Sequence, residues 1–140
     1  MKKKILVILS ILIASLLFLA ACAPAPSEAS VEVTCDEFNK QATINKEVEV
    51  ALDGLLTVGL CSDLTPSFNW YWSLSGPYII DEVDLENNPP EGNLIGAPDM
   101  DVRTFKAWKR GKTTLVLEQK RPLALEEKGP WKLNLSVTVR

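Results

Sequence analysis

Apolar and polar side chains alternate without interruption through Trp131-Lys132-Leu133-Asn134-Leu135-Ser136-Val137-Thr138-Val139-Arg140. Because successive side chains of a β-strand point to opposite faces, five apolar residues would line one face of this segment and five polar residues the other. Shorter alternating segments precede it, at Val48-Glu49-Val50 and at Leu56-Thr57-Val58-Gly59-Leu60. The sequence therefore predicts strands that each have one buried face.

Turn-forming residues separate these segments. Turns are favoured at Asp53-Gly54, where the chain would reverse into a return strand, at Ser75-Gly76-Pro77, and at Lys109-Arg110-Gly111-Lys112 as a basic hairpin turn. The prolines and glycine of Asn87–Asn93 exclude a central strand, and Arg121-Pro122-Leu123 is expected to break the strand pairing. No segment after residue 22 keeps an apolar stripe at helical spacing. We predict an all-β fold, an immunoglobulin-like antiparallel β-sandwich of about seven strands.

Composition excludes several classes of function. The chain has 140 residues, of which 46% are hydrophobic and 24% charged, proportions typical of a globular protein. It contains no histidine, which excludes Ser-His-Asp and Cys-His catalysis and histidine-ligated zinc, and its three cysteines cannot fill a four-thiolate site. We therefore expect a protein that is not an enzyme and that holds no cofactor and no metal.

The first 21 residues have the pattern of an export signal. Three lysines, Lys2 to Lys4, precede the seventeen uncharged residues Ile5–Ala21. A single membrane-spanning helix is the alternative, because seventeen residues is the short limit for crossing a bilayer. Without this leader the chain has 12 basic and 18 acidic residues, a formal net charge of −6, which opposes binding to nucleic acid.

A cysteine follows the leader directly. The tetrapeptide Leu19-Ala20-Ala21-Cys22 resembles a bacterial lipobox, in which the signal is cut before a cysteine that then receives lipid. The resemblance implies a protein that is exported and anchored to the bacterial cell envelope through lipid on Cys22, with a spanning helix or a plain secreted form as alternatives. We also expect the protein to be a monomer. We expect a lipoprotein signal peptide over residues 1–21, the lipidated cysteine and a flexible tether over 22–30, and one sandwich domain over 31–140.

Two cysteines remain once Cys22 is assigned to lipid. Cys35 is expected at the end of a first strand that contains Val31 and Val33, and Cys61 at the end of a later strand. An exported protein meets an oxidising environment, so a disulfide between them is the natural pairing. It would contribute about 3 to 4 kcal/mol by restricting the unfolded chain. Two buried free thiols are the alternative.

Three further clusters have both a structural and a functional interpretation. The acidic run Asp81–Glu86 could bind calcium, but it lacks the spacing of a calcium loop, so a solvated strand edge is favoured. The aromatic run Trp70–Trp72 could stack sugars, but its two tryptophans share a face, which favours the core. Lys109–Lys112 could contact an anionic partner, although a basic turn is usually a hairpin tip.

Five segments follow one another in a recognisable order. They are Cys35-Asp36-Glu37-Phe38, Leu60–Trp70, Thr104-Phe105-Lys106-Ala107, Arg121-Pro122-Leu123 and Trp131–Leu135. Together they resemble the bacterial branch of the chagasin-type inhibitors of papain-like cysteine proteases, over nearly the whole chain after the leader. In that family an immunoglobulin-like sandwich presents three loops from one end, and these occlude the active-site cleft of the protease.

The match to the family loops is partial. Thr65 falls on the first threonine of the central loop, Phe68 and Trp70 on the aromatic residue and the tryptophan that end it, and Arg121 and Pro122 on the start of the third loop. The departures are Asp63, Leu64, Pro66 and Ser67 in the central loop, Ala97, Pro98 and Asp99 after the retained Gly96 in the middle loop, and Leu123 in place of a tryptophan in the third loop.

The resemblance implies a protease-binding surface at one end of the sandwich, shaped as a convex ridge. Its residues would be Thr65, Pro66, Ser67, Phe68, Gly96, Ala97, Arg121, Pro122 and Leu123. The function implied is a membrane-tethered inhibitor of papain-like cysteine proteases. The alternative is a non-inhibitory lipoprotein binding module whose loops are retuned for a peptide or envelope ligand. Thr65 and Arg121 favour inhibition, whereas Pro98, Asp99 and Leu123 favour retuning.

Overall fold

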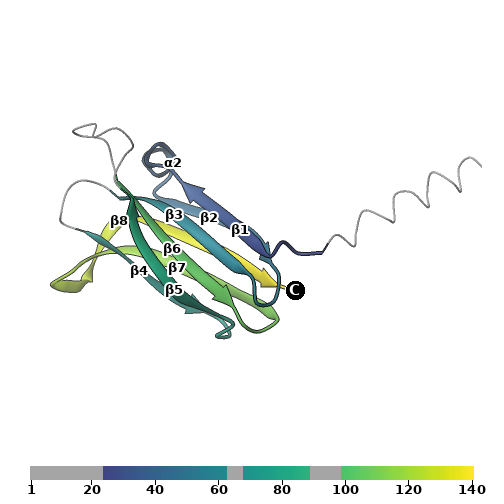
Figure 1. The fold of residues 1–140 in the computed structure, drawn as a ribbon. Coiled ribbons are helices and arrows are strands. Elements are labelled where there is room, and N and C mark those ends of the chain that lie inside the picture. Colours follow the sequence, from purple (N-terminus) through teal and green to yellow (C-terminus); the bar gives the residue numbers. More distant parts are fainter. Residues whose placement is uncertain (1–23, 63–67, 89–98) are drawn as a thin grey trace, which may run out of the picture.

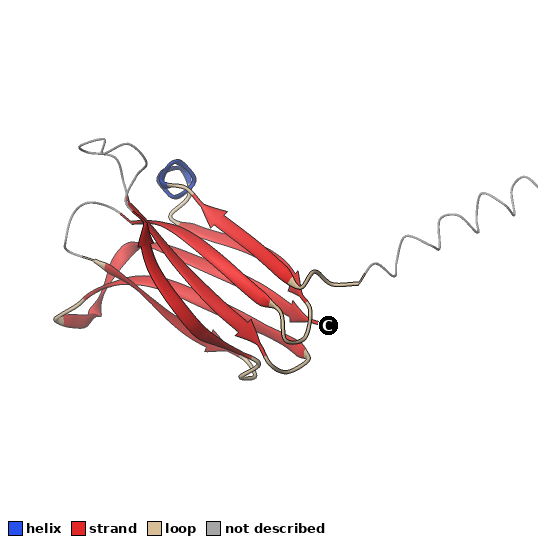
Figure 2. Ribbon diagram, in the orientation of Figure 1, coloured by secondary structure: helices blue, strands red, loops and turns tan. Residues whose placement is uncertain are grey.

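The computed structural model describes residues 24–62, 68–88 and 99–140 as eight strands and one short helix. The elements in chain order are β1 (Glu28–Val33), α2 (Cys35–Lys40), β2 (Thr43–Val50), β3 (Leu55–Ser62), β4 (Asn69–Ser75), β5 (Ile80–Asn88), β6 (Asp99–Ala107), β7 (Gly111–Arg121) and β8 (Ala124–Val139). They form two four-stranded sheets, ordered β1-β3-β6-β5 and β2-β8-β7-β4 (Figures 1 and 2). The prediction of an all-β immunoglobulin-like sandwich is confirmed.

The core lies between the two sheets and follows the alternation in the sequence. In β8, Leu133, Leu135 and Val137 are fully buried, and the polar residues between them face outward. The facing sheet contributes the buried side chains of Leu56, Phe105 and their neighbours in β3 and β6. Burial of these apolar side chains, at about 25 cal/mol per Å², is the main force that holds the sheets together.

Strand pairing departs from the prediction in two places. The pairs β1–β3 and β2–β8 run parallel, whereas all the other pairs in the described part of the chain are antiparallel. The turns at Asp53-Gly54 and at Lys109–Gly111 join strands of different sheets, so they are not the hairpin connections that the sequence predicted. Alternation fixes which face of a strand is buried, but both sheets bury the same kind of face, so the pattern cannot assign a strand to a sheet.

A hairpin that the sequence did not predict joins β7 and β8. Arg121-Pro122-Leu123 was expected to break the pairing, but the ladder continues to the pair Arg121–Ala124, with register shifts beside Lys120. From the pair Glu118–Lys132 to the pair Arg121–Ala124, β7 advances three residues and β8 eight, so β8 takes up five extra residues in these irregularities. Pro122 and Leu123 therefore occupy the turn of a long hairpin.

The helix α2 was also missed. Cys35 was expected in the first strand, but it begins a six-residue helix. The helix is capped by Thr34, whose hydroxyl accepts from the amide of Glu37, while the Glu37 carboxylate accepts from the amide of Thr34. This capping box is visible in the sequence as Thr-x-x-Glu, but a six-residue helix is too short to show an apolar stripe.

The sandwich begins at Glu28, three residues before the expected boundary at Val31. The carbonyls of Pro26 and Ser27 accept from the amides of Ala51 and Leu55 at 2.8 and 2.9 Å. Ser27 approaches so closely that a Cβ on Gly54 would lie 2.6 Å from its carbonyl oxygen. Part of the expected tether is therefore held in the domain.

Cys22 and the leader lie outside the described residues, and so does the expectation of lipid attachment. Among the residues that are described, no helix is long and apolar enough to cross a membrane.

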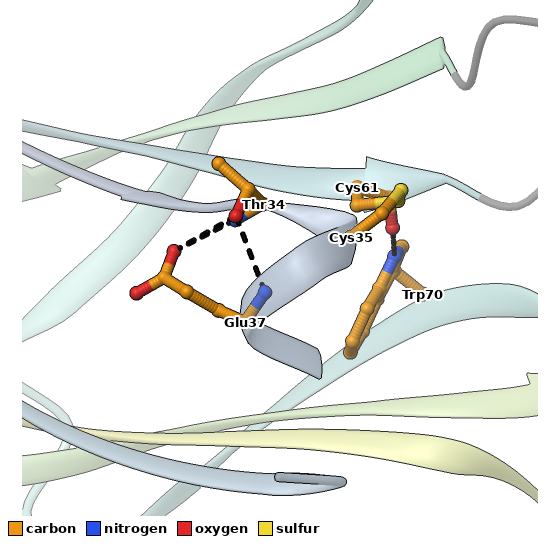
Figure 3. Close-up of a disulfide and its surroundings, with 5 residues drawn as sticks. All are labelled: Thr34, Cys35, Glu37, Cys61 and Trp70. Carbon is orange, nitrogen blue, oxygen red and sulfur yellow. Dashed lines mark hydrogen bonds between the residues drawn. A yellow bond between two sulfur atoms is a disulfide. The ribbon is translucent and has the colours of Figure 1, made fainter. Parts of the chain in front are cut away.

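The predicted disulfide between Cys35 and Cys61 is present, with a Cα–Cα distance of 5.1 Å (Figure 3). It attaches α2 to the end of β3. Phe38, which α2 buries, stacks on Trp131 of β8 with ring centroids 5.1 Å apart. The helix thus connects both sheets at one end of the sandwich.

Replacing both cysteines by alanine tests the contribution of this crosslink. We expect Cys35→Ala/Cys61→Ala to lower the free energy of unfolding by about 3 to 4 kcal/mol. The disulfide joins residues 26 apart in the sequence, and without it the unfolded chain regains the conformational entropy that this crosslink removes. Urea unfolding measures the loss, and reductant should weaken the wild type but leave the variant unchanged. Equal midpoints for wild type and variant would contradict this role.

Candidate functional site

The strand ends that flank the three predicted loops lie at one end of the sandwich (Figure 1). In one sheet, Ser62 at the end of β3 pairs with Asp99 at the start of β6, and Asn88 at the end of β5 pairs with Met100. In the other sheet, Asn69 at the start of β4 pairs with Lys120, directly before the β7–β8 turn. The sequence order alone does not bring these ends together, since they come from both sheets.

The predicted site residues are only partly described. Phe68, Arg121, Pro122 and Leu123 lie within the described ranges. The expected positions of Thr65, Pro66, Ser67, Gly96 and Ala97 fall outside the described residues. The convex ridge that these loops were expected to form therefore stays a prediction.

Two of the predicted residues are in contact. The guanidinium carbon of Arg121 lies 5.6 Å from the centroid of the Phe68 ring, within the range of a cation–π interaction. The Nη2 of the same guanidinium forms an ion pair with Glu127 at 3.2 Å. Arg121 is half exposed, so these contacts orient the side chain while leaving it accessible to a partner.

Phe68 rests against Gly129 of β8, a residue that the sequence analysis missed. A Cβ on Gly129 would lie 3.0 Å from Phe68 Cδ1 and 2.6 Å from Gln119 Cβ. Only glycine lets the ring of Phe68 approach the strand this closely. The signal was present in the sequence, because a glycine inside a strand often marks a close approach of another part of the chain.

Leu123 is completely exposed at the turn between β7 and β8. A leucine side chain with its whole surface in water gains free energy when a partner covers it. Pro122, its neighbour, restricts the backbone of the turn. The third loop thus presents an apolar tip beside the oriented cation of Arg121.

The hairpin that carries this tip is held by charges on its outer face. Glu118 in β7 pairs with Lys132 in β8 at 2.9 Å and lies 3.7 Å from both Lys120 and Lys128. The hydrogen bond from Lys132 holds the pKa of Glu118 below its usual range. Opposite charges on paired strands add modestly to sheet stability.

The two ends of the predicted central loop are fastened by Cys61 and Trp70 (Figure 3). The indole Nε1 of Trp70 donates to the carbonyl oxygen of Cys61 at 3.0 Å, and both residues are buried. Phe38 covers Trp70 with a centroid distance of 5.4 Å. Trp70 is therefore a core residue, as the alternation of the aromatic run indicated.

A buried ion network lies directly behind this end. Arg103 in β6 is 7% exposed and donates from Nε to Asp101 at 2.9 Å, from Nη1 to Glu82 at 2.8 Å, and from Nη2 to the carbonyl of Trp70 at 2.9 Å. The second carboxylate oxygen of Glu82 accepts from Trp72 Nε1 at 2.7 Å. One guanidinium thus connects strands β4, β5 and β6 across the two sheets.

The acidic run was expected to be a solvated strand edge, with a calcium site as the alternative. That interpretation holds for β5, which is the edge of its sheet and bears exposed Asp81 and Asp84. Glu82, however, points inward, and a register shift follows it at Val83. The missed signal is in β6, where Asp101, Arg103 and Phe105 share the inward face by alternation.

Burial is the main influence on Asp101. Loss of solvent raises the pKa of Asp101 above its usual value, and the Arg103 guanidinium counteracts part of that rise. Arg103 therefore offsets part of the free-energy cost of burying the charged carboxylate.

A hollow of about 240 Å³ opens between β4 and β5 beside this network. Its lining residues include Asn69, Trp70 and Tyr71 of β4, Leu85 of β5 and Arg103 of β6. Within the described ranges, Thr113 Oγ1 is the one buried side-chain polar atom that has no hydrogen-bond partner, and no group of acidic or cysteine side chains has the arrangement of a metal site.

Comparison with known proteins shows which solved structures share this fold. No family model and no curated protein sequence matches the chain. The cysteine protease inhibitor EhICP2 from Entamoeba histolytica has a TM-score of 0.62 at 19% identity, and the match covers 82% of this chain and 99% of that one. PbICP-C, solved in complex with falcipain-2, has a TM-score of 0.59 at 16% identity over 80% of this chain and 99% of that one.

A third solved structure, amebosin, has a TM-score of 0.52 at 20% identity, and the match covers 81% of this chain and 98% of that one. Identities this low show a shared fold. The fold of this chain is therefore one that a cysteine protease inhibitor uses over its full length.

Removing the central cation tests the ion network. We expect Arg103→Leu to lower the free energy of unfolding by about 3 to 5 kcal/mol at neutral pH, the usual cost of leaving buried charges unpaired. Without Arg103 the folded-state pKa of Asp101 rises further, so the folded protein binds a proton more tightly than the unfolded chain does. The loss should therefore be small at acid pH and should grow as the pH rises through that pKa.

Urea unfolding at mildly acidic and at neutral pH measures this dependence. Arg140→Leu is the matched control, because Arg140 pairs with Glu49 at the exposed surface and its loss should cost less than about 1 kcal/mol. A loss for Arg103→Leu that is independent of pH, or no larger than that of the control, contradicts the proposed role of the network.

Proposed function

We propose that this protein is an inhibitor of papain-like cysteine proteases that is tethered to a membrane by lipid on Cys22. The observation that carries the inhibitory role is the likeness in fold to EhICP2, which extends over the full length of that inhibitor. PbICP-C, which shares the fold, was solved bound to falcipain-2, a papain-like cysteine protease. The resemblance of the loop sequences to chagasin-type inhibitors supports the same class independently of the fold.

Inhibition of this kind needs no catalytic residue. A loop that enters the cleft without presenting a bond for cleavage excludes substrate by its volume and its hydrogen bonds. In this proposal Thr65 of the central loop would supply a hydroxyl near the reactive thiolate of the protease. Trp70 and the Cys35–Cys61 disulfide hold the two ends of that loop, which lowers the entropy lost on binding.

The third loop supplies a second contact. Arg121 is held between Phe68 and Glu127, so its planar guanidinium is positioned before the protease arrives. Leu123 projects beyond it and replaces the tryptophan of the family consensus. A leucine covers less surface than a tryptophan, so we expect this contact to be the weak point of the interface.

The lipid anchor fits the shape of the domain. Pro26 and Ser27 are hydrogen-bonded to Ala51 and Leu55, at the end of the sandwich opposite the three loops (Figure 1). Lipid on Cys22 would therefore hold the domain by one end and leave the proposed inhibitory loops directed away from the membrane. The lipobox residues that precede Cys22 support this anchor.

The alternative is a lipoprotein module whose loops bind another peptide or an envelope component. The exposed Leu123 and the departures in the other two loops are compatible with it. The fold of the comparison structures and the orientation of Arg121 favour the inhibitor.

Titration of papain with loop variants tests the proposal. The sample is the chain from residue 22 with Cys22→Ser, which lacks lipid and contains every described residue. We expect Leu123→Trp to tighten inhibition by about 2 to 4 kcal/mol, or ~30-fold to ~1000-fold, by restoring an aromatic anchor. Thr65→Arg should abolish inhibition, because its bulk and charge prevent entry of the central loop into the cleft.

Ser75→Arg is the matched control, since it adds the same side chain at an exposed position at the other end of β4. It should inhibit as the wild type does, and none of the variants should inhibit trypsin. Thermal unfolding confirms that each variant is folded. If wild type and Thr65→Arg are equally weak and Leu123→Trp gains nothing, the loops do not form a protease wedge, and the binding module becomes the better explanation.

A further inference from the structure

Two large aromatic side chains are exposed at the end of the sandwich opposite the proposed protease-binding loops. Tyr78 is 52% exposed and Trp108 is 46% exposed, and their ring centroids lie 5.5 Å apart. The amide of Trp108 donates to the carbonyl of Ile79 at 3.1 Å, which fixes the two connections β4–β5 and β6–β7 beside each other. Exposed tryptophan and tyrosine rings are typical of a membrane interface.

Positive charge accompanies the aromatic pair. Lys109 and Arg110 follow Trp108 directly, Lys112 is the second residue of β7, and all three are exposed. In the described part of the chain, none of these three side chains lies within 4.0 Å of a carboxylate oxygen of another residue. The acidic residues Asp53 and Asp81 also lie near this end, and Asp81 raises the pKa of the Tyr78 hydroxyl. The basic residues of this end are grouped on the Lys109–Lys112 connection.

The amino-terminal segment reaches the domain at the same end. Pro26 is bonded to Ala51, and two residues further on the amide of Asp53 donates to the carbonyl of Ala107 at 2.8 Å. Cys22 lies four positions before Pro26, and four residue steps of fully extended chain span at most about 14 Å. Lipid on Cys22 would therefore keep this end close to the bilayer surface.

We propose that Tyr78, Trp108, Lys109 and Arg110 form a docking surface for a bilayer that contains anionic phospholipid. The proposal rests on the lipid anchor of the proposed function, because the anchor delivers this end to the membrane. The rings enter the interfacial layer, and the basic side chains meet the phosphates of the headgroups. The short anchor makes the contact intramolecular, so even a weak surface is occupied much of the time.

Docking fixes the orientation of the domain. The eleven residues of β7, at about 3.3 Å each, run from the docking surface at Gly111 to Arg121, a span of roughly 35 Å. The loop end would then stand away from the bilayer, where a protease can reach it without contacting lipid.

Quenching of tryptophan fluorescence by brominated lipid tests the surface. The sample is the mature lipoprotein, with the lipid on Cys22 verified by mass, in vesicles of brominated phosphatidylcholine mixed with phosphatidylglycerol. Trp70 is buried and Trp72 and Trp131 are partly buried, so Trp108 should account for most of the quenching. We expect quenching in the wild type and its loss in Trp108→Phe.

The charge dependence is tested by reversal. Lys109→Glu/Arg110→Glu should lower the ratio of docked to undocked protein by at least about 25-fold, since each basic residue near an anionic surface contributes about fivefold and each new carboxylate is repelled. Lys40→Glu/Lys128→Glu is the matched control, because it reverses two exposed lysines at the loop end, and it should dock as the wild type does. Vesicles without phosphatidylglycerol should reduce quenching of the wild type.

Equal quenching of wild type and Trp108→Phe, or equal effects of the two charge reversals, overturns the proposal. Titration of papain with the same vesicles separates this proposal from the inhibitory function. Inhibition without quenching would contradict docking but not the inhibitory function. Quenching without inhibition would support docking and contradict the protease target.

Discussion

Cys61 is held from two directions at the point where β3 ends. Its sulfur is bonded to Cys35 at the start of α2, and its carbonyl oxygen accepts from the indole of Trp70 at the start of β4. Ser62 follows at the end of β3, and Asn69 precedes Trp70. The two ends of the central loop are therefore fixed to each other and to the helix, and everything proposed for that loop depends on this attachment.

The ion network of Arg103 extends the same constraint to the edge of the sheet. Arg103 reaches the carbonyl of Trp70 as well as Asp101 and Glu82, so it connects the start of β4 to β5 and β6. A buried ion pair contributes little net stability compared with apolar packing, but it tolerates few alternative geometries. We infer that the ion network fixes the position of one sheet relative to the other at the end where the loops emerge.

Much of the fold was predictable from local patterns. The uninterrupted alternation of β8 gave its buried face, the shared face of Trp70 and Trp72 indicated the core, and the export signal favoured the disulfide that the structure contains. The assignment of strands to sheets was not predictable, because Asp53-Gly54 can turn a chain within a sheet or across to the other one. The site was predictable as residue types only. The contact of Arg121 with Phe68, and the glycine that admits Phe68, result from pairing between distant segments.

Hydrogen exchange of the protein alone and in complex with papain tests the inhibitory function most directly. If the loop end enters the cleft, papain should slow exchange in residues 62–70 and 119–124, and leave the outer faces of both sheets and the Tyr78–Trp108 end unchanged. Slowed exchange along the exposed edge of β5 or at the Tyr78–Trp108 end, with residues 62–70 and 119–124 unaffected, would contradict a protease wedge built from these loops.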